Sequence, residues 1–253
     1  MSARLWLLLP SYEEEKSLPP LLEDLRKTLA GWPDAPPTTV VVVDDGSLDR
    51  TAQVAREAGV AAPFALDVLI HERNQGLGAA LRTGIEHVLA RAGEDDLLAT
   101  MDADHTHPPE LLPAMVAKLQ AGADLVIASR FQPGASVHGL GPFRRGVSRA
   151  ASWLLRVVFP GARDYTCGYR VYRVALLRWG QARYKDAFLN QAGFSVMVDL
   201  LLKLRRRARR IEEVPLTLRY DRKQSTSKMK LVQTASVTLS LLVLRFRGDP
   251  RGP

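Results

Sequence analysis

Short apolar runs alternate with amphipathic stretches through the first half of the chain. The runs are continuous and end at turn-forming or polar residues, as strands do when a sheet is covered on both faces. They span Leu5–Leu9, Thr39–Val43, Leu66–Ile70, Leu97–Met101 and Leu125–Ser129. Helical spacing fills the intervals Leu18–Ala30, Asp49–Ala58, Gly78–Arg91 and Pro108–Ala121. This alternation predicts an α/β fold with a mainly parallel central sheet, helices on both faces and a ligand site beyond the carboxyl ends of the strands.

The pattern changes after Arg130. We expect a helix over Phe143–Phe159, a strand over Tyr169–Tyr172 and a helix over Ser195–Arg207. A strand over Ile211–Tyr220 and a final helix or interfacial segment over Thr234–Phe246 follow. Because no Ser/Gly-rich linker separates the halves, the sequence predicts one catalytic domain over residues 1–230 and a C-terminal segment over residues 231–253.

Composition narrows the class of protein. The chain has 253 residues, of which 46% are hydrophobic, which suits a packed core and argues against disorder. Its single cysteine, Cys167, excludes an internal disulfide and suits a reducing cytosol. The apolar stretch that ends at Pro10 is too short for a signal peptide, and Leu231–Leu244 is shorter than the roughly 20 residues of a membrane span. We therefore expect a cytoplasmic protein.

The formal net charge is +8, which suits nucleic acid, an anionic membrane surface or a phosphorylated substrate as partner, or simply a solvated surface. The densest positive run is Arg205–Arg207 with Arg209 and Arg210. It fits a contact with anionic lipid headgroups and equally a solvated helix end. A basic nucleic-acid-binding module is one alternative that this charge suggests. The acidic residues at the strand ends would repel nucleic-acid phosphates, so this alternative is disfavoured and no nucleic-acid partner is expected.

Two acidic pairs follow core strands directly. Asp44 and Asp45 come after Val40–Val43, and Asp102 and Asp104 come after Leu97–Met101. The carboxyl ends of parallel strands meet at one edge, so both pairs should project there. Two carboxylates on one loop suit a hard cation such as Mg²⁺ or Mn²⁺, which neutralises the charge that develops on a diphosphate leaving group.

These motifs resemble the family 2 glycosyltransferases, and within them the dolichol-phosphate (polyprenyl-phosphate) mannose synthases. The matches run in order from Pro10-Ser11-Tyr12-Glu13-Glu14 through Val43-Asp44-Asp45-Gly46-Ser47-Leu48-Asp49, Asp102-Ala103-Asp104-His105-Thr106-His107-Pro108-Pro109-Glu110 and Ser129-Arg130-Phe131 to Asp164–Arg170, Glu213-Val214-Pro215 and Arg222 with Ser227-Lys228. The resemblance implies a Rossmann-like GT-A domain. It also implies inverting transfer of a hexose, mannose from GDP-mannose above all, onto a polyprenyl or dolichyl phosphate at the cytoplasmic face of a membrane.

The resemblance also implies residue roles. The donor nucleotide would be held by Pro10, Tyr12, Glu14, Asp44 and Asp45, with Arg222 and Lys228 closing over its diphosphate. Asp102 and Asp104 would be catalytic and bind the metal, with Thr106 as a further ligand where the family has Gln. The acceptor phosphate would be held by Arg130, also catalytic, with Arg144, Arg145 and Ser148. A homo-oligomer or a separate membrane-anchor protein is a further possible partner.

The acceptor decides which groups the reaction needs. A phosphate monoester is already anionic at neutral pH, so it needs positioning by cations and no general base. A saccharide hydroxyl would need a base, and Asp164 or Asp199 would be the candidates. We expect both to be structural, Asp164 through an ion pair with Arg170 and Asp199 on an apolar helix near the core. A related glycosyltransferase with a soluble or saccharide acceptor stays open as the alternative.

Overall fold

A seven-stranded sheet forms the centre of the molecule. The computed structural model describes residues 3–60, 62–139, 161–191, 193 and 195–223. Within them the strand order is β3-β2-β1-β4-β7-β5-β8. The strands are β1 (Leu5–Ser11), β2 (Thr38–Asp44), β3 (Ala65–Ile70), β4 (Leu97–Thr100), β5 (Leu125–Ser129), β7 (Arg170–Arg173) and β8 (Ile211–Pro215). All neighbours are parallel except β7, which runs antiparallel to both β4 and β5. The predicted mainly parallel sheet is confirmed.

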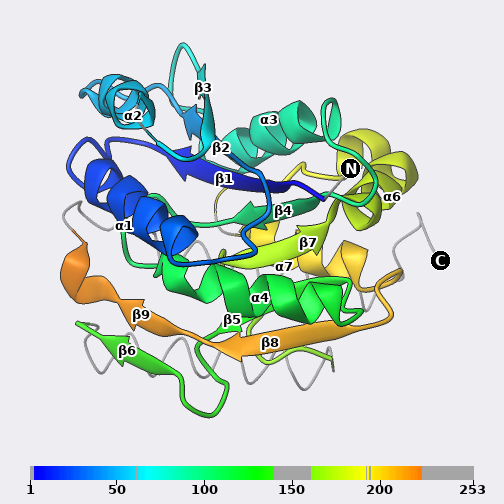
Figure 1. Cartoon of the computed structure of the whole chain (residues 1–253). Coiled ribbons are helices and arrows are strands. Elements are labelled where there is room, and N and C mark those ends of the chain that lie inside the picture. The colour runs from blue at the N-terminus through cyan, green and yellow to red at the C-terminus, as the bar shows by residue number, and fades with distance from the viewer. Residues whose placement is uncertain (1–2, 61, 140–160, 192, 194, 224–253) are drawn as a thin grey trace.

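Helices cover both faces of the sheet. Helices α1 (Leu18–Ala30) and α4 (Leu112–Gln120) lie on the near face in Figure 1, and α3 (Leu77–Leu89), α6 (Val174–Tyr184) and α7 (Ser195–Leu204) lie behind it. Helix α2 (Thr51–Gly59) packs against α1 and β3. Short 3₁₀ turns occur at Pro109–Leu111, Lys185–Ala187 and Tyr220–Arg222 (η1, η2 and η3).

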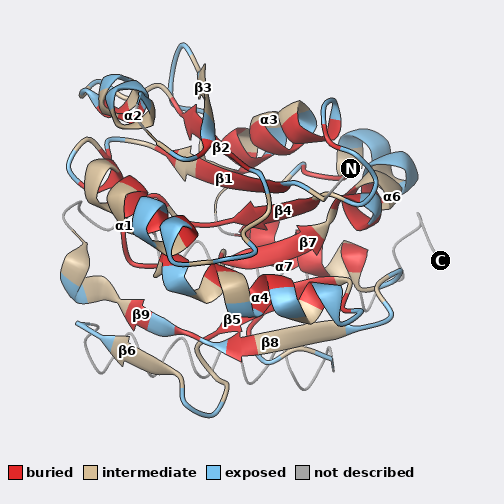
Figure 2. Cartoon of the chain, viewed as in Figure 1, coloured by how far each residue is buried: buried red, intermediate tan, exposed pale blue. Residues whose placement is uncertain are grey.

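The core follows the strands (Figure 2). All seven residues of β2 are buried, as are all residues of β4 and β5. The edge strands β3 and β8 are only half-buried. Four of the continuous apolar runs, those of β1, β2, β4 and β5, therefore mark strands covered on both faces, as predicted. The same expectation is wrong for Leu66–Ile70, because β3 lies at the edge of the sheet and is partly exposed.

The second half differs from the sequence-based expectation. The strand expected over Ile211–Tyr220 is divided at Leu216: β8 joins the main sheet, and β9 (Thr217–Arg219) pairs with β6 (Ser136–His138) in a separate two-stranded sheet. Helix α6 was not predicted at all. The helix expected over Ser195–Arg207 ends at Leu204. The helices expected over Phe143–Phe159 and Thr234–Phe246 lie outside the described residues.

Candidate active site

The predicted site residues gather at one edge of the sheet. Parallel strands β1, β2, β4 and β5 all end there, so the segments that follow them are neighbours in space. Because β7 is antiparallel, its amino end lies at this same edge, with Arg170 opposite Thr100. The loop that precedes β7 therefore lies beside the segments that follow the parallel strands. Chain segments from Pro10 to Lys223 meet here.

Asp45 organises the donor side of this edge. Its carboxylate accepts hydrogen bonds from His71 Nδ1 at 2.7 Å, the Gln75 N–H at 3.0 Å and the Gly76 N–H at 2.7 Å. His71 also bonds Thr83 on α3 through Nε2 at 2.9 Å. Asp45 thus ties the loop between β3 and α3 to the end of β2. Asp44 accepts one hydrogen bond from the described residues, from the Ser47 N–H at 3.0 Å.

A glycine makes this arrangement possible. Gly46 has φ of +72°, and a Cβ at this position would lie 2.4 Å from the backbone of Arg73. Any side chain would both strain the turn and push away the loop that Asp45 holds. The neighbouring motif Pro10–Glu14 has an energetic cost in its backbone, because Glu13 has φ of +53°. Asn tolerates that conformation better than Glu.

The first motif lies against α2 and its preceding turn. Glu14 is buried and its N–H donates to the Thr51 hydroxyl at 2.8 Å. Tyr12 is half-buried, and partial burial together with Glu13 raises the pKa of its phenol. Pro10 pairs with Val43 in the sheet register, so the first motif and the Asp44–Asp45 motif lie side by side.

Asp102 lies at the centre of the edge with its carboxylate unengaged. No described residue donates a hydrogen bond to it, and His107 Nδ1, which accepts the Asp102 N–H at 3.2 Å, stands 3.9 Å from its Oδ2. Burial raises the pKa of this carboxyl group. A Cβ on Gly168 would come within 2.9 Å of its Oδ1, so only glycine leaves room for it there. A partly buried carboxylate without a donor suits a cation.

Asp104 is engaged on both oxygens. Its Oδ1 accepts the Thr106 N–H at 3.1 Å and the Thr106 hydroxyl at 2.7 Å. Its Oδ2 receives Lys223 Nζ at 2.5 Å. Burial acts to raise the pKa of Asp104, but Lys223 outweighs it and the pKa falls below its ordinary value. Thr106, predicted as a metal ligand, here orients the carboxylate.

Arg130 is held by Asp164 and not by the acidic pair. Its Nε and Nη2 donate to the two Asp164 oxygens, each at 2.8 Å, and its N–H adds a third bond at 3.1 Å. Asp164 is fully buried and also accepts N–H bonds from Thr166 and Cys167. Burial acts to raise its pKa, but Arg130 and the N–H donors lower it on balance. No described residue pairs with Nη1 of Arg130.

The predicted ion pair between Asp164 and Arg170 is wrong. Arg170 is fully buried and donates to the carbonyl oxygens of Met197, at 2.6 Å, and Tyr165, at 2.8 Å. It ties β7 to α7, whereas Asp164 turns toward the site edge. The expectation for Asp199 is confirmed, since it is buried on α7 and pairs with Lys203.

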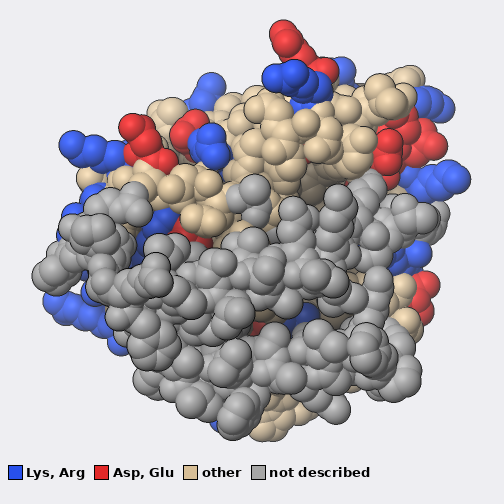
Figure 3. All heavy atoms as spheres, turned by 180° about the vertical axis from the view of Figure 1, so that it is seen from behind, with Lys and Arg blue, Asp and Glu red and all other residues tan. Residues whose placement is uncertain are grey.

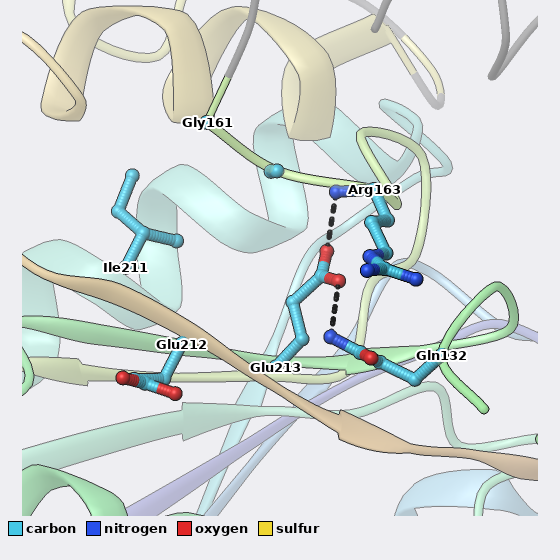
Figure 4. A pocket seen from close by; sticks show the side chains of 7 residues that line it. Gln132, Gly161, Arg163, Ile211, Glu212 and Glu213 are labelled. Atoms are coloured by element: carbon cyan, nitrogen blue, oxygen red, sulfur yellow. Dashed lines mark hydrogen bonds between the residues drawn. The ribbon is translucent and has the colours of Figure 1, made fainter. Parts of the chain in front are cut away.

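Glu213 fixes the loop that carries Asp164. Its Oε1 accepts the N–H groups of Arg163 at 2.6 Å and Asp164 at 3.0 Å, and its Oε2 accepts Gln132 Nε2 at 3.0 Å. Figure 4 shows this carboxylate reaching from β8 to the loop, with Glu212 pointing the other way. A cavity of about 400 Å³ lies beside these side chains.

Arg222 is tied to α1. Its Nη1 donates to Asp24 Oδ2 at 3.2 Å, and the same oxygen receives His105 Nε2 at 2.9 Å. Asp24 therefore joins α1 to the loop of Asp104 and to η3. Neither Asp24 nor Lys223 was predicted as a site residue, because nothing in their local sequence marks them. Lys228, Arg144, Arg145 and Ser148 lie outside the described residues.

The described residues do not form a complete metal site. No group of three or more His, Cys, Asp or Glu side chains in the described part of the chain stands close enough to hold an ion. Asp102 and Asp104 fit a cation that takes its remaining oxygen ligands from a bound diphosphate. Within the described segments, no helix has the length and apolar character to cross a bilayer.

Comparison with known proteins identifies the class. Solved structures of glucosyl-3-phosphoglycerate synthase from Mycobacterium tuberculosis, one with Mn²⁺, UDP and glucosyl-3-phosphoglycerate, match 96% of this chain and 80% of theirs with a TM-score of 0.63 at 19% identity. That likeness shows the fold, and the fold is that of a GT-A glycosyltransferase.

The family follows from the sequence comparisons. The profile of glycosyl transferase family 2 matches residues 6–179. The polyprenol monophosphomannose synthase of Mycolicibacterium smegmatis is 33% identical over 228 residues, which cover 89% of this chain and 81% of that protein. The undecaprenyl-phosphate mannosyltransferase of Micrococcus luteus is 36% identical over 227 residues, covering 89% and 87%. The chain belongs to glycosyl transferase family 2 and is a glycosyltransferase, as the motifs predicted.

Proposed function

We propose that this enzyme transfers a hexose from a nucleoside diphosphate to a polyprenyl phosphate with inversion at the anomeric carbon, and that its donor is GDP-mannose. The observation that carries the proposal is the likeness to two polyprenyl-phosphate mannosyltransferases over nine-tenths of the chain, the same stretch that builds the site edge. A third relative, the dolichol-phosphate mannosyltransferase of Pyrococcus furiosus, is 28% identical over 227 residues and is itself longer, with 58% of it covered.

The donor binds along the ends of β1, β2 and β4 in this proposal. Pro10, Tyr12, Glu14 and Asp44 surround the nucleoside, and Asp45 acts by holding the loop between β3 and α3 in place. Asp102 and Asp104, assisted by Thr106, hold Mg²⁺ or Mn²⁺, which neutralises charge on the leaving diphosphate when bound. Arg222 and Lys228 would bind the diphosphate.

The acceptor phosphate binds at Arg130, together with Arg144, Arg145 and Ser148 from outside the described residues. Asp164 fixes the Arg130 guanidinium through two bonds and leaves Nη1 for a phosphate oxygen. The geometry disfavours a hydroxyl acceptor. Both candidate bases are engaged, Asp164 by Arg130 and N–H groups and Asp199 by Lys203, so neither is placed to take a proton from a saccharide.

The distribution of charge supports action at a membrane surface. Residues 140–160 and 224–253 contain nine of the 35 Lys and Arg and one of the 27 Asp and Glu. The rest of the chain is thus balanced in charge, and Figure 3 shows its acidic and basic side chains intermingled around the rim of that view. We propose that the positive charge of these two stretches favours binding to the anionic headgroups around the lipid acceptor, where each Lys or Arg near the surface contributes about 1 kcal/mol.

A thermal-shift panel of nucleotide sugars with Mn²⁺ or Mg²⁺, followed by transfer of labelled sugar to polyprenyl phosphate, tests the proposal. GDP-mannose should stabilise the protein only with metal, and label should pass into the lipid. Stabilisation by a UDP-sugar instead would overturn the donor. Stabilisation without lipid labelling, together with transfer to a soluble acceptor, would overturn the acceptor.

A further inference from the structure

The acidic edge of the site contains an ammonium group as well as carboxylates. Lys223 Nζ lies 2.5 Å from Asp104 Oδ2, and only 16% of the Lys223 side chain and 12% of the Asp104 side chain are exposed. The Tyr220 ring centroid is 6.0 Å from Nζ. This is a largely desolvated ion pair at the position where a divalent cation would meet the acidic pair.

The edge needs this positive charge when no ligand is bound. Asp102 and Asp104 lie two residues apart, and their like charges repel in a poorly hydrated site. The other described cations nearby are engaged elsewhere: Arg130 by Asp164 and Arg222 by Asp24. Lys223 is the described cation that directly contacts the acidic pair, so it offsets part of the negative charge of this pair.

A metal ion and Lys223 would compete for the same oxygen of Asp104. Thr106 already gives two hydrogen bonds to Oδ1, which leaves Oδ2 as the oxygen for a metal, and Lys223 occupies that oxygen. The end of β9 is attached to the Asp104 loop independently of Lys223, since the Arg219 N–H donates to the Thr106 carbonyl at 2.9 Å. A displaced ammonium would still lie beside the anionic diphosphate that arrives with the metal.

We propose that Lys223 is the internal counter-ion of the acidic pair before donor and metal bind, and that its ammonium moves from Asp104 to the nucleoside diphosphate when the metal enters. The inference rests on the proposed function, since it takes Asp104 as a metal ligand. Two consequences follow. The metal alone binds weakly because it must displace an ammonium, and metal and diphosphate bind cooperatively because the diphosphate offers that ammonium a new partner.

Mn²⁺ titration of the full chain, followed by the electron paramagnetic resonance signal of free Mn²⁺, tests the exchange without any transfer assay. We compare the wild type with Lys223→Met, which keeps the apolar stem, and with Lys118→Met, which removes a lysine that pairs with Glu212 away from the site. Lys223→Met should bind Mn²⁺ alone roughly tenfold tighter, the size of one charge-assisted hydrogen bond. Lys118→Met should match the wild type.

The same titration with added GDP or UDP measures the coupling. Diphosphate should tighten Mn²⁺ binding by a larger factor in the wild type than in Lys223→Met. Equal Mn²⁺ affinity of wild type and Lys223→Met, or no Mn²⁺ binding by either, would overturn the inference. Thermal unfolding checks that the variant folds, and Lys223→Gln provides a second variant if it does not. Sugar transfer to lipid is measured separately, so loss of the proposed function and loss of the exchange give different results.

Discussion

Glu213 offers the sharpest test of how the site is held together. Its carboxylate accepts three hydrogen bonds, from the N–H groups of Arg163 and Asp164 and from the Gln132 amide. In Glu213→Ala, water can replace the carboxylate at the N–H of Arg163, which is exposed. Asp164 is fully buried, so its N–H is left without an acceptor. An unsatisfied buried donor costs about 1–3 kcal/mol, so we expect a loss of about 2 kcal/mol in unfolding free energy. For a chain of this length that lowers Tm by about 4–8 °C.

The functional effect should fall on one substrate. The loop that Glu213 holds presents Asp164, which in turn aims Arg130. Glu213→Ala should raise KM for polyprenyl phosphate by roughly tenfold, the equivalent of about 1.4 kcal/mol, and leave KM for the nucleotide sugar unchanged. Glu213→Gln keeps a carbonyl oxygen for both N–H groups and should restore most of the stability and the acceptor KM.

The preceding residue on β8, Glu212, provides the matched control. Glu212 points away from the loop and pairs with Lys118 and Arg210, whose side chains are 37% and 53% exposed. Such exposed pairs contribute at most about 1 kcal/mol. Urea unfolding followed by circular dichroism, with steady-state kinetics for each substrate, makes the comparison. If Glu212→Ala were as costly as Glu213→Ala, or if the donor KM rose equally, the positioning argument would be refuted.

Three further changes probe other parts of the site. Asp104→Asn should abolish measurable transfer while thermal unfolding shows a folded protein, because it removes charge from the metal-binding edge; full activity would contradict the metal assignment. Asp164→Asn should lose about 3–5 kcal/mol at pH 7 by leaving Arg130 unpaired, as urea unfolding will report. The folded-state pKa of Asp164 lies below its unfolded value of about 3.9. Its contribution to the free energy of unfolding is therefore present above that pH and is lost as pH falls through the folded pKa. The difference in unfolding free energy between variant and wild type should accordingly close in acid. Gly46→Ala should cost more than about 2 kcal/mol, and Gly76→Ala, which has φ of +89° but nothing within 4 Å, should cost only about 1–2 kcal/mol from its conformation; equal losses would contradict the predicted clash.

The first half of the fold could be predicted because its signal is local. Strands such as Val40–Val43 are continuous apolar runs, and their burial on both faces is written in that pattern. Helix α6 was missed because its apolar residues do not follow a clear helical spacing and are interrupted by Arg178 and Gly180. The division of the strand at Leu216 depends on which sheet each part joins, a long-range choice.

The candidate site shows the same limit. The position of the acidic pairs followed from the strands that precede them, and the structure places both pairs at the sheet edge. The partners of these carboxylates could not be predicted. Lys223 is 119 residues from Asp104 in the sequence, and the path of β9 decides that this lysine reaches Asp104. Asp164 was paired with the wrong arginine for a related reason: Arg170 is closer in sequence, but it points into the core.

The antiparallel strand β7 also bears on the order in which the molecule can form. It is the strand that links β4 to β5, so the sheet consists of a half made of β3, β2, β1 and β4 and a half made of β5 and β8, joined only through residues 170–173. During synthesis the first half can pair as soon as β4 emerges. Strand β5 must wait more than 40 residues for its neighbour, with its apolar residues and edge unpaired. Chains stalled or cut between residues 130 and 170 should therefore be the aggregation-prone ones.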